Sequence, residues 1–331
     1  MAGNASLQKA KAAKADEFYT RREDIESELF HYARFFDDKI VYCNCDDPKT
    51  SEFWRFFVRN FIPWNLKKLI ATHYEPCESV CSYKLELARG MEGRKRVGDR
   101  EPVLTRLPCN GDFRSSACIE LLEEADIVVT NPPFSLFREY ITQLVERGKK
   151  FVVIAPFSGL KYRETFPFFK ENKIWLGYTS PKLFRVPIGS TGRSVFVENG
   201  VSYQKFGNVC WITNFDIAKR HEEIDLRGNY YDPARYPSYT NFDGIDVASV
   251  SDIPCDYEGF MGVPISFMTD YNPDQFEIVG LGEGNLAKEI GITRNARGRT
   301  DLEVQNPDGT RRRPWARIVI KRKGKVSDNE D

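Results

Sequence analysis

The chain has 331 residues, enough to bury a sizeable core in one large domain or two. Basic and acidic residues are equal in number, so the formal net charge is zero, and this balance excludes a uniformly polycationic nucleic-acid binder. Hydrophobic residues make up 41% of the chain and its longest apolar runs, such as 151–157, are strand-sized, so we expect a globular protein without a signal peptide or membrane span.

Between residues 16 and 216, short apolar runs alternate with segments whose apolar residues recur at helical spacing. The expected strands are 39–44, 66–72, 126–130, 150–155 and 174–178. The expected helices are 25–36, 51–60, 116–124 and 136–145, the last of them capped by Ser135. Strands that alternate with helices predict an α/β fold, with a doubly wound, mostly parallel sheet and helices on both faces.

Three segments depart from this alternation. Residues 1–15 are rich in alanine and lysine and are expected to form a mobile arm. Residues 75–108 are polar and rich in glycine and arginine, and we interpret them as an insertion with a hairpin on either side of 90–98. At 194–197 and 209–214 two strands follow each other without a helix, which predicts an antiparallel pair at one sheet edge.

The composition changes beyond Phe215. Tyrosine, proline and aspartate dominate 228–257, where regular periodicity is poor, and the clearest strands that follow are 276–281 and 316–321. Residues 294–325 hold eleven lysines and arginines against three acidic residues. The C-terminal part therefore carries a local basic excess that the balanced overall charge conceals.

Gly280, Gly282 and Gly284 follow one of these strands. No convincing helix start comes after them, so we expect loop flexibility rather than a dinucleotide-binding fingerprint. A phosphate-binding Gly-x-x-x-x-Gly-Lys motif is also absent from the strand–helix junctions of the sequence.

The eight cysteines are expected to be reduced thiols of a cytoplasmic protein. His73, Cys77 and Cys81 are spaced by fours and Cys43 and Cys45 by two, but there is no Cys-x-x-Cys pair. Buried free thiols are therefore favoured over a structural zinc site, and we expect no metal.

The strand at 126–130 ends in a rigid polar corner, Asn131-Pro132-Pro133-Phe134. Neither proline can donate a backbone hydrogen bond, and Pro132 pushes Asn131 toward an extended backbone. The Asn131 side chain and the Pro132 carbonyl offer acceptors for an amino group, and Phe134 offers a flat face for a planar base. Because ligands of open α/β sheets bind at the carboxyl ends of strands, we expect a site for an exocyclic amine such as that of adenine. The alternative is a proline-rich turn with a core phenylalanine.

The chain resembles the EcoRI-type adenine-specific DNA methyltransferases in four blocks that occur in the family's order. The blocks are 16–20, 41–48, 131–140 and 272–278. The resemblance implies a Rossmann-like methyltransferase sheet and a C-terminal target-recognition region. It also implies methyl transfer to N6 of an adenine flipped out of duplex DNA at a specific sequence, with Asn131, Pro132, Pro133 and Phe134 as the catalytic corner.

S-adenosylmethionine is the cofactor that the resemblance implies. The residues expected to bind it are Phe18, Tyr19, Thr20, Asp46, Asp47, Asp112 and Phe113. The N-terminal three are expected to cover the methionine end and donate to its carboxylate, and the paired aspartates to accept from its ammonium group. The last two are expected to hold the adenine ring. The turn with the paired aspartates lacks the glycines common in such folds. The alternative for the N-terminal three residues is aromatic packing at a helix entry, and the alternative for Asp112 is a solvated turn aspartate.

Duplex DNA is the expected partner, and its phosphates are expected to contact two basic segments. The candidates are Lys182, Arg185, Arg193, Arg294, Arg297, Arg299, Arg311, Arg312 and Arg313. The first three flank 189–192, a glycine-rich loop whose composition favours ordering on DNA. The alternative for any basic run is a solvated face.

The expected organisation is an arm at 1–15, a cofactor-binding catalytic domain at 16–216 and a target-recognition region at 217–331. We expect a monomer that works alongside a restriction endonuclease without binding it stably. Two other classes stay open: methylation of adenine in RNA or of a protein glutamine, which Asn-Pro-Pro-aromatic corners also serve, and a DNA-binding relative that has lost catalysis.

Overall fold

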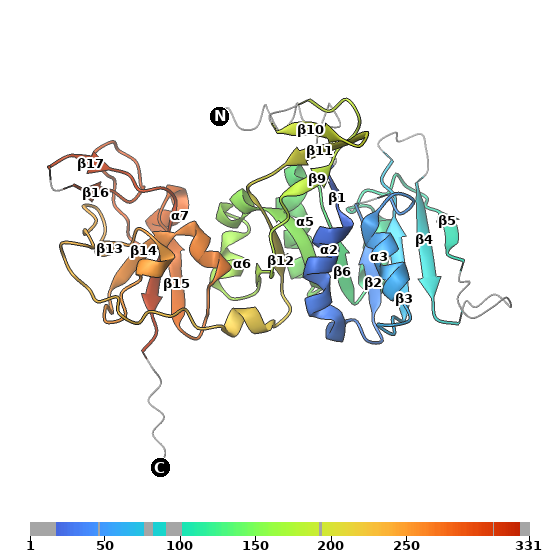
Figure 1. Cartoon of the computed structure of the whole chain (residues 1–331), viewed down its shortest axis with the longest axis horizontal. Helices are drawn as coiled ribbons and strands as arrows, with labels where there is room; N and C mark the ends of the chain where they lie inside the picture. The colour runs from blue at the N-terminus through green and yellow to red at the C-terminus, as the bar shows by residue number, and fades with distance from the viewer. Residues whose placement is uncertain are drawn as a thin grey trace, which may run out of the picture. The chain divides into compact units, whose positions relative to one another are not determined.

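The computed structural model describes residues 18–45, 47–75, 82–90, 101–191, 194–306 and 308–324. The chain forms two compact units (Figure 1). Unit 1 comprises the chain up to Thr165 together with Leu176–Phe215, and unit 2 comprises Phe166–Trp175 and the chain from Asp216 onward. The arm expected at 1–15 lies outside the described residues. Across the described ranges, no helix has the length and apolar character needed to span a membrane.

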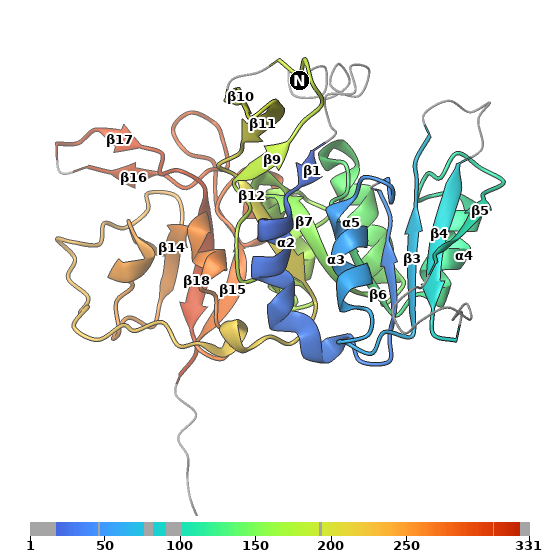
Figure 2. The same cartoon turned by 45° about the vertical axis from the view of Figure 1, so that its right-hand side comes forward.

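An eight-stranded mixed sheet forms the centre of unit 1 (Figures 1 and 2). In spatial order its strands are β5 (Val103–Arg106), β4 (Tyr83–Ala88), β3 (Lys68–Thr72), β2 (Ile40–Cys43), β6 (Ile127–Thr130), β7 (Lys150–Pro156), β12 (Val209–Thr213) and β8 (Trp175–Leu176). The four strands β3, β2, β6 and β7 are parallel, whereas β4, β5 and β12 are antiparallel to their neighbours. The α/β class is confirmed, but the sheet is mixed: these four parallel strands are flanked by the antiparallel strands β4 and β5 on one side and β12 on the other.

The helices of unit 1 are α2 (Arg22–Leu29), α3 (Glu52–Asn60), α4 (Ser116–Glu124) and α5 (Phe137–Glu146). Ser51 caps α3 by accepting from the amide of Trp54 at 3.4 Å. Phe53, Phe56 and Phe57 of this helix are fully buried, and each contributes about 1.5–3 kcal/mol through burial. Helix α3 also contacts α2 and β3, while α4 contacts β2 and α5 contacts β7.

A second, four-stranded sheet of unit 1 corrects one expectation. Its order is β1 (Tyr19–Thr20), β9 (Leu183–Arg185), β11 (Val201–Lys205) and β10 (Val195–Glu198). The expected pairing of 194–197 with 209–214 is wrong, because β10 pairs with β11 and β12 pairs with β7. Asn199 and Gly200 explain this: both have positive φ (50° and 77°), which is the geometry of a tight two-residue hairpin turn.

The start of α5 corrects a second expectation. The corner 131–134 leads into a short 3-10 turn, Phe134–Leu136, in which the Leu136 amide donates to the Pro133 carbonyl at 2.9 Å. The α-helix therefore begins at Phe137, and its N-cap residue is Leu136, without a side-chain cap. Ser135 lies inside the 3-10 turn that the prolines start, so it is not the cap.

The described residues of unit 2 form a four-stranded sheet, a two-stranded ribbon and two short helices. Its elements are α6 (Phe166–Lys170), β13 (Ile245–Asp246), β14 (Phe260–Pro264), β15 (Phe276–Leu281), α7 (Gly284–Glu289), β16 (Val304–Gln305), β17 (Arg311–Arg312) and β18 (Arg317–Arg322). The sheet order is β13-β14-β18-β15, and β16 pairs with β17. The remaining 3-10 helices of the described ranges, in both units, are Phe30–Phe35, Phe157–Lys161, Ala218–His221, Val250–Asp252 and Ile265–Thr269.

The glycine run after β15 corrects a third expectation. A Cβ at Gly280 would lie 2.5 Å from the Ile290 side chain, and one at Gly282 would lie 2.6 Å from Leu302. Gly284 begins helix α7, which the sequence did not predict. The first two glycines therefore serve close packing, and the segment is an ordered strand-to-helix turn.

Candidate active site

The site lies where the order of the central strands reverses. The chain runs from β2 to β3 on one side, then returns to β6 on the other side of β2 and continues to β7. Such a reversal leaves a crevice at the carboxyl ends of the two neighbouring strands. Asn44 and Cys45 follow β2 at this place, and the corner 131–134 follows β6.

A hydrogen bond holds the Asn131 amide in one orientation. Its Nδ2 donates to the backbone carbonyl of Phe18 at 2.6 Å. A carbonyl oxygen can only accept, so the amide nitrogen must face Phe18 and Oδ1 must face the other way. Asn131 is 7% exposed, and its Oδ1 accepts no hydrogen bond from any described residue. The corner thus presents a buried, unused acceptor.

The loop after β2 is bonded to the corner's own strand and helix. The Thr130 hydroxyl donates to the Asn44 carbonyl, and the Tyr140 hydroxyl of α5 donates to Asn44 Oδ1. All three residues are buried. Burial of the ring raises the pKa of Tyr140 well above its usual range, so this donor stays protonated. The two strand ends are therefore held together by side chains as well as by the sheet.

Phe134 lies among aromatic rings rather than alone. Its ring centroid is 5.7 Å from that of Phe18 and 6.5 Å from that of Phe206. Phe18 also packs edge-on against Phe206 and Phe184. Phe134 itself is half-buried, so part of the ring remains accessible while its neighbours restrict its rotation. The sequence did not single out Phe184 or Phe206, because β9 and the segment after β11 are far from the corner in the chain.

A pocket of about 370 Å³ opens beside the N-terminal block. It is lined by Tyr19, Thr20, Thr50, Ser51, Glu52, Arg185, Val186, Ile188, Gly200, Val201 and Ser202. Thr20 is 2% exposed, and its hydroxyl has no hydrogen-bond partner among the described residues. Nε of Arg185 also has no hydrogen-bond partner among the described residues, and Nη1 of the same side chain lies 4.0 Å from Glu52 Oε1. A guanidinium, a carboxylate and an unused hydroxyl in one recess complement a zwitterionic amino acid.

Strand pairing brings Arg185 to this pocket. Arg185 stands opposite Tyr19 in the ladder between β1 and β9, so it lies with the N-terminal block rather than with a separate basic surface. Lys182, just before β9, is exposed. Arg193 lies outside the described residues. No local sequence signal could have joined Arg185 to Tyr19, because the pairing connects segments far apart in the chain.

The Asp47 carboxylate accepts hydrogen bonds from neighbouring residues of unit 1. Its Oδ1 accepts from the Tyr83 hydroxyl of β4 and from the Lys49 amide at 3.0 Å. Burial, and then the hydrogen bond to Asp47, raise the pKa of the Tyr83 phenol. Lys49 also lies over the Tyr83 ring, 4.5 Å from its centroid. The carboxylate thus ties the turn after β2 to the predicted hairpin, whose strands β4 and β5 pair antiparallel. Asp46 lies outside the described residues.

Asp112 and Phe113 pack against the helix that follows the corner. Asp112 forms an ion pair with Arg114 at 2.7 Å, and Arg114 also bonds Glu139 of α5 at 2.9 Å. The hydrogen bond to Asp112 raises the pKa of Arg114. Phe113 is buried edge-on against Tyr140, with ring centroids 5.0 Å apart. Both residues lie close to α5, but the carboxylate already has a cationic partner.

The basic candidates of unit 2 fall into two groups. Arg311, Arg312 and Arg313 each form ion pairs: with Glu303 at 3.1 Å, with Asp246 at 2.8 Å, and with Glu283 at 2.9 Å respectively. Arg294, Arg297 and Arg299 form no ion pair with any described residue and lie in an exposed loop. Only the second group has its charge fully available for a ligand.

Within the described ranges, no cluster of three or more histidine, cysteine or acidic side chains is arranged to hold a metal ion. Cys109, Cys118, Cys210 and Cys255 are free thiols. Cys77 and Cys81, which the sequence groups with His73, lie outside the described residues.

Comparison with known proteins identifies the family. Residues 6–323 match the family model of the adenine-specific methyltransferase EcoRI. The chain is 42% identical to the Type II methyltransferase M.EcoRI of Escherichia coli over 308 residues, which cover 88% of this chain and 93% of the relative.

Two Mycoplasma proteins are similar over almost their whole length. The Type II methyltransferase M.MpnI of Mycoplasma pneumoniae is 36% identical over 329 residues, covering 96% of this chain and 98% of the relative. M.MgeORF184P of Mycoplasma genitalium is 35% identical over 325 residues, covering 95% and 98%. No solved structure shows significant similarity to the chain. The chain therefore belongs to the adenine-specific methyltransferase EcoRI family, and the enzyme is a DNA adenine methyltransferase.

Proposed function

We propose that the enzyme transfers a methyl group from S-adenosylmethionine to N6 of an adenine that is flipped out of duplex DNA at a specific sequence. The observation that carries the proposal is the Asn131 amide, whose oxygen is a buried and unused acceptor at the carboxyl end of β6. Leaving such an acceptor unpaired costs about 1–3 kcal/mol, which a hydrogen bond from an amino group would recover.

In this mechanism the corner acts on the amine alone. Asn131 Oδ1 and the Pro132 carbonyl accept hydrogen bonds from the two N–H groups of the adenine amine. These contacts favour a pyramidal nitrogen whose lone pair faces the methyl group. The adenine amine is a weak nucleophile because its lone pair is delocalised, so these contacts strengthen in the transition state. Because Phe18 fixes the amide orientation, the acceptor does not reorganise during the reaction. Pro133 keeps the corner rigid.

Phe134 supplies the stacking face for the flipped base. Flipping costs about a few kcal/mol, and stacking on an aromatic side chain returns about 1–3 kcal/mol. The rings of Phe18 and Phe206 pack against Phe134 and restrict its rotation. Hydrogen bonding at Asn131 adds to this stabilisation.

The cofactor supplies an activated sulfonium methyl group, so the reaction needs no nucleophilic side chain. The proposed contacts are those expected from the family: Phe18, Tyr19, Thr20, Asp46, Asp47, Asp112 and Phe113. The unused Thr20 hydroxyl supports the carboxylate contact, and we add Arg185 and Glu52 of the same pocket for the carboxylate and ammonium groups. The ion pair of Asp112 with Arg114 means that an adenine contact there would share this carboxylate.

We further propose a doubly wound, Rossmann-like arrangement for 16–216 and target recognition for 217–331, in a monomer that acts in the cytoplasm. DNA contacts are proposed for Lys182, Arg193, Arg294, Arg297 and Arg299, whereas Arg185 is assigned to the cofactor pocket and Arg311, Arg312 and Arg313 pair with acidic side chains of unit 2. A cognate restriction endonuclease would act on the same DNA sequence without binding this chain stably.

Offering the enzyme duplex DNA, RNA and a protein extract in parallel, with a methyl-labelled donor, tests the proposed function. We expect label in duplex DNA alone, recovered as N6-methyladenine after digestion. Label in RNA or in protein glutamine would favour the other methyltransferase classes. Specific DNA binding without any transfer would favour a relative that has lost catalysis.

A further inference from the structure

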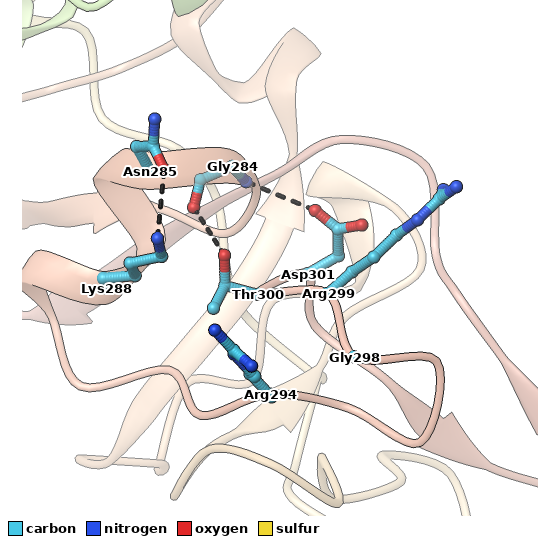
Figure 3. A pocket seen from close by; sticks show the side chains of 8 residues that line it. All are labelled: Gly284, Asn285, Lys288, Arg294, Gly298, Arg299, Thr300 and Asp301. Atoms are coloured by element: carbon cyan, nitrogen blue, oxygen red, sulfur yellow. Dashed lines mark hydrogen bonds between the residues drawn. The ribbon is translucent and has the colours of Figure 1, made fainter.

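A second pocket, of about 350 Å³, lies within unit 2 between α7 and the loop 293–301 (Figure 3). It is lined by Gly284, Asn285, Lys288, Arg294, Gly298, Arg299, Thr300 and Asp301. Three of these side chains are cationic, and Asp301 is the single carboxylate. In Figure 3 the ends of Lys288 and Arg294 lie around Thr300, while Arg299 extends away beside Asp301.

The charges of this pocket are not neutralised by the surrounding protein. Lys288, Arg294 and Arg299 form no ion pair with a described residue, and the Lys288 ammonium donates to a neutral acceptor, Asn285 Oδ1, at 3.1 Å. Asp301 is already engaged, because its Oδ1 accepts from the Gly284 amide at 3.2 Å and its Oδ2 lies 3.4 Å from Arg313 Nε. The pocket therefore has a net positive charge that an anion can use.

The contrast with other arginines of unit 2 shows that this is not a general property of the surface. Arg227, Arg235, Arg312 and Arg317 all form close ion pairs with aspartates, at 2.7–2.8 Å. Arginines in this unit are thus commonly paired. Arg294, Arg297 and Arg299 of the loop 293–301 differ from these four because they form no ion pair with a described residue.

Two buried asparagines hold the loop that carries these arginines. Asn241 is 7% exposed and donates to the carbonyls of Thr293 and Asp301, both at 2.9 Å, so it joins the two ends of the loop. Asn295 is 8% exposed, and its Oδ1 accepts from the amides of Arg297 at 3.0 Å and Arg299 at 3.1 Å. The loop backbone is therefore set before any ligand arrives, which lowers the entropic cost of binding.

We propose that Lys288, Arg294 and Arg299 bind consecutive backbone phosphates of the duplex DNA substrate, with Asn241 and Asn295 as positioning residues. This inference rests on the proposed function, because it names the part of unit 2 that holds the substrate. Guanidinium groups bind phosphate oxygens in a bidentate way, and such contacts position a duplex without reading its sequence. Arg311, Arg312 and Arg313, by contrast, are held by carboxylates of unit 2 itself.

The test compares DNA binding over a range of salt concentrations for the full-length enzyme, the triple variant Lys288→Ala/Arg294→Ala/Arg299→Ala and the control Arg227→Ala. Arg227 is a matched control because it is an exposed arginine of the same unit that pairs with Asp225. We expect the triple variant to bind the cognate duplex about tenfold or more weakly than the unaltered enzyme does, and to lose affinity for a scrambled duplex by a similar factor. Its log–log salt slope should fall by about 0.9 for each phosphate that the variant no longer neutralises.

The outcomes separate this inference from the proposed function. An unchanged slope and affinity in the triple variant would overturn the phosphate site even if the enzyme methylates DNA normally. A selective loss for the cognate duplex would also overturn it, because the residues would then read bases. If free inorganic phosphate binds the pocket at low millimolar concentration while the triple variant binds DNA normally, the pocket is a site for a small anion and the DNA-phosphate proposal is overturned. Absence of methyl transfer by the unaltered enzyme, with the slope change present, would refute the proposed function alone.

A positioning variant completes the test. Asn295→Ala should lower DNA affinity in the same sequence-independent way while all three cations are still present. Wild-type affinity and an unchanged salt slope in this variant would show that the loop does not need to be held. Cofactor affinity should stay unchanged in every variant, since these residues all belong to unit 2.

Discussion

The Asn131 oxygen stays available as an acceptor because the amide is held in one orientation. A rotation of the amide would place Oδ1 where Nδ2 now lies, 2.6 Å from the Phe18 carbonyl, and two oxygens without a hydrogen between them repel at that distance. The carbonyl that accepts from Asn131 belongs to Phe18 of the N-terminal block, next to Tyr19 and Thr20. The residues proposed to bind the cofactor and the residue proposed to bind the amine are therefore adjacent through one hydrogen bond.

Arg185 gives the first prediction at this scale. If its guanidinium meets the cofactor's carboxylate in the pocket with Thr20, Arg185→Ala should weaken S-adenosylmethionine binding about tenfold or more, because hydrogen bonds to charged groups contribute about 1.5–3 kcal/mol. Calorimetric titration of the cofactor measures this. Lys182→Ala, an exposed neighbour, is the control and should bind the cofactor normally. Weakened DNA binding with normal cofactor binding in Arg185→Ala would instead support the DNA contact that the sequence suggests.

The residues near Asp112 show where local sequence reasoning reaches its limit. A Gly-Asp-Phe turn before a helix has the composition of a nucleoside contact, and the structure keeps both residues beside α5. The sequence could not show that Arg114, two residues later, would use the carboxylate. Competition between a neighbouring side chain and a ligand for one acceptor depends on rotamers, which composition does not determine.

At the scale of elements, the sequence predicted correctly those helices and strands whose bounds depend on residues close together in the chain. The helix 116–124 and the strand 276–281 appear in the structure with the predicted bounds, because periodicity and flanking turn residues mark both. The pairing of β10 depended instead on a two-residue turn, and the start of α5 on how two prolines direct the next turn. The helix at Gly284 was missed because its six residues are too few to show a period.

Arg312 gives a prediction at this scale. It joins the ribbon strand β17 to Asp246 of β13, whose carboxylate is buried and also bonds Arg317 at 2.8 Å and the Tyr239 hydroxyl at 2.9 Å. Burial and the nearby Asp246 charge raise the pKa of Tyr239 well above its usual range. Arg312→Ala should lower the free energy of unfolding by about 1–3 kcal/mol, because a buried charge loses one of its two cations. Urea denaturation measures this, and Arg294→Ala should change stability by less than about 0.5 kcal/mol. Equal stability of both variants would contradict an internal role for Arg312.

Gly177 gives a second prediction at this scale. It follows β8, where the buried Glu28 of α2 accepts from the Tyr178 amide at 2.9 Å and the Thr179 amide at 2.6 Å. A Cβ at Gly177 would lie 2.1 Å from Glu28 Oε1 and 2.8 Å from the Trp211 side chain. Gly177→Ala should therefore destabilise the protein by about 1–3 kcal/mol through overpacking. Gly207→Ala is the control, because no atom lies within 4 Å of its Cβ position. A melting temperature for Gly177→Ala equal to that of the control would contradict this packing account.

For the whole molecule, the sequence predicted an α/β catalytic part and the family, while the assembly of the site required the structure. The motif 131–134 and the blocks around it are contiguous in sequence, so they could be found without coordinates. The reversal of strand order between β3 and β6, and the approach of β9 to β1, are long-range pairings that no local pattern encodes. For the same reason the sequence grouped all nine basic residues as equals, although some are paired within the protein.

The central claim is that Asn131 accepts a hydrogen bond from the target amine during methyl transfer. The most direct measurement is single-turnover transfer of labelled methyl from S-adenosylmethionine to cognate duplex DNA by Asn131→Ala, with cofactor affinity measured on the same preparation and Asn208→Ala, an exposed asparagine, as control. We predict a loss of transfer of about 10²-fold or more with cofactor affinity within a few-fold of normal, as for the loss of one transition-state hydrogen bond. Near-normal transfer by Asn131→Ala would contradict the account.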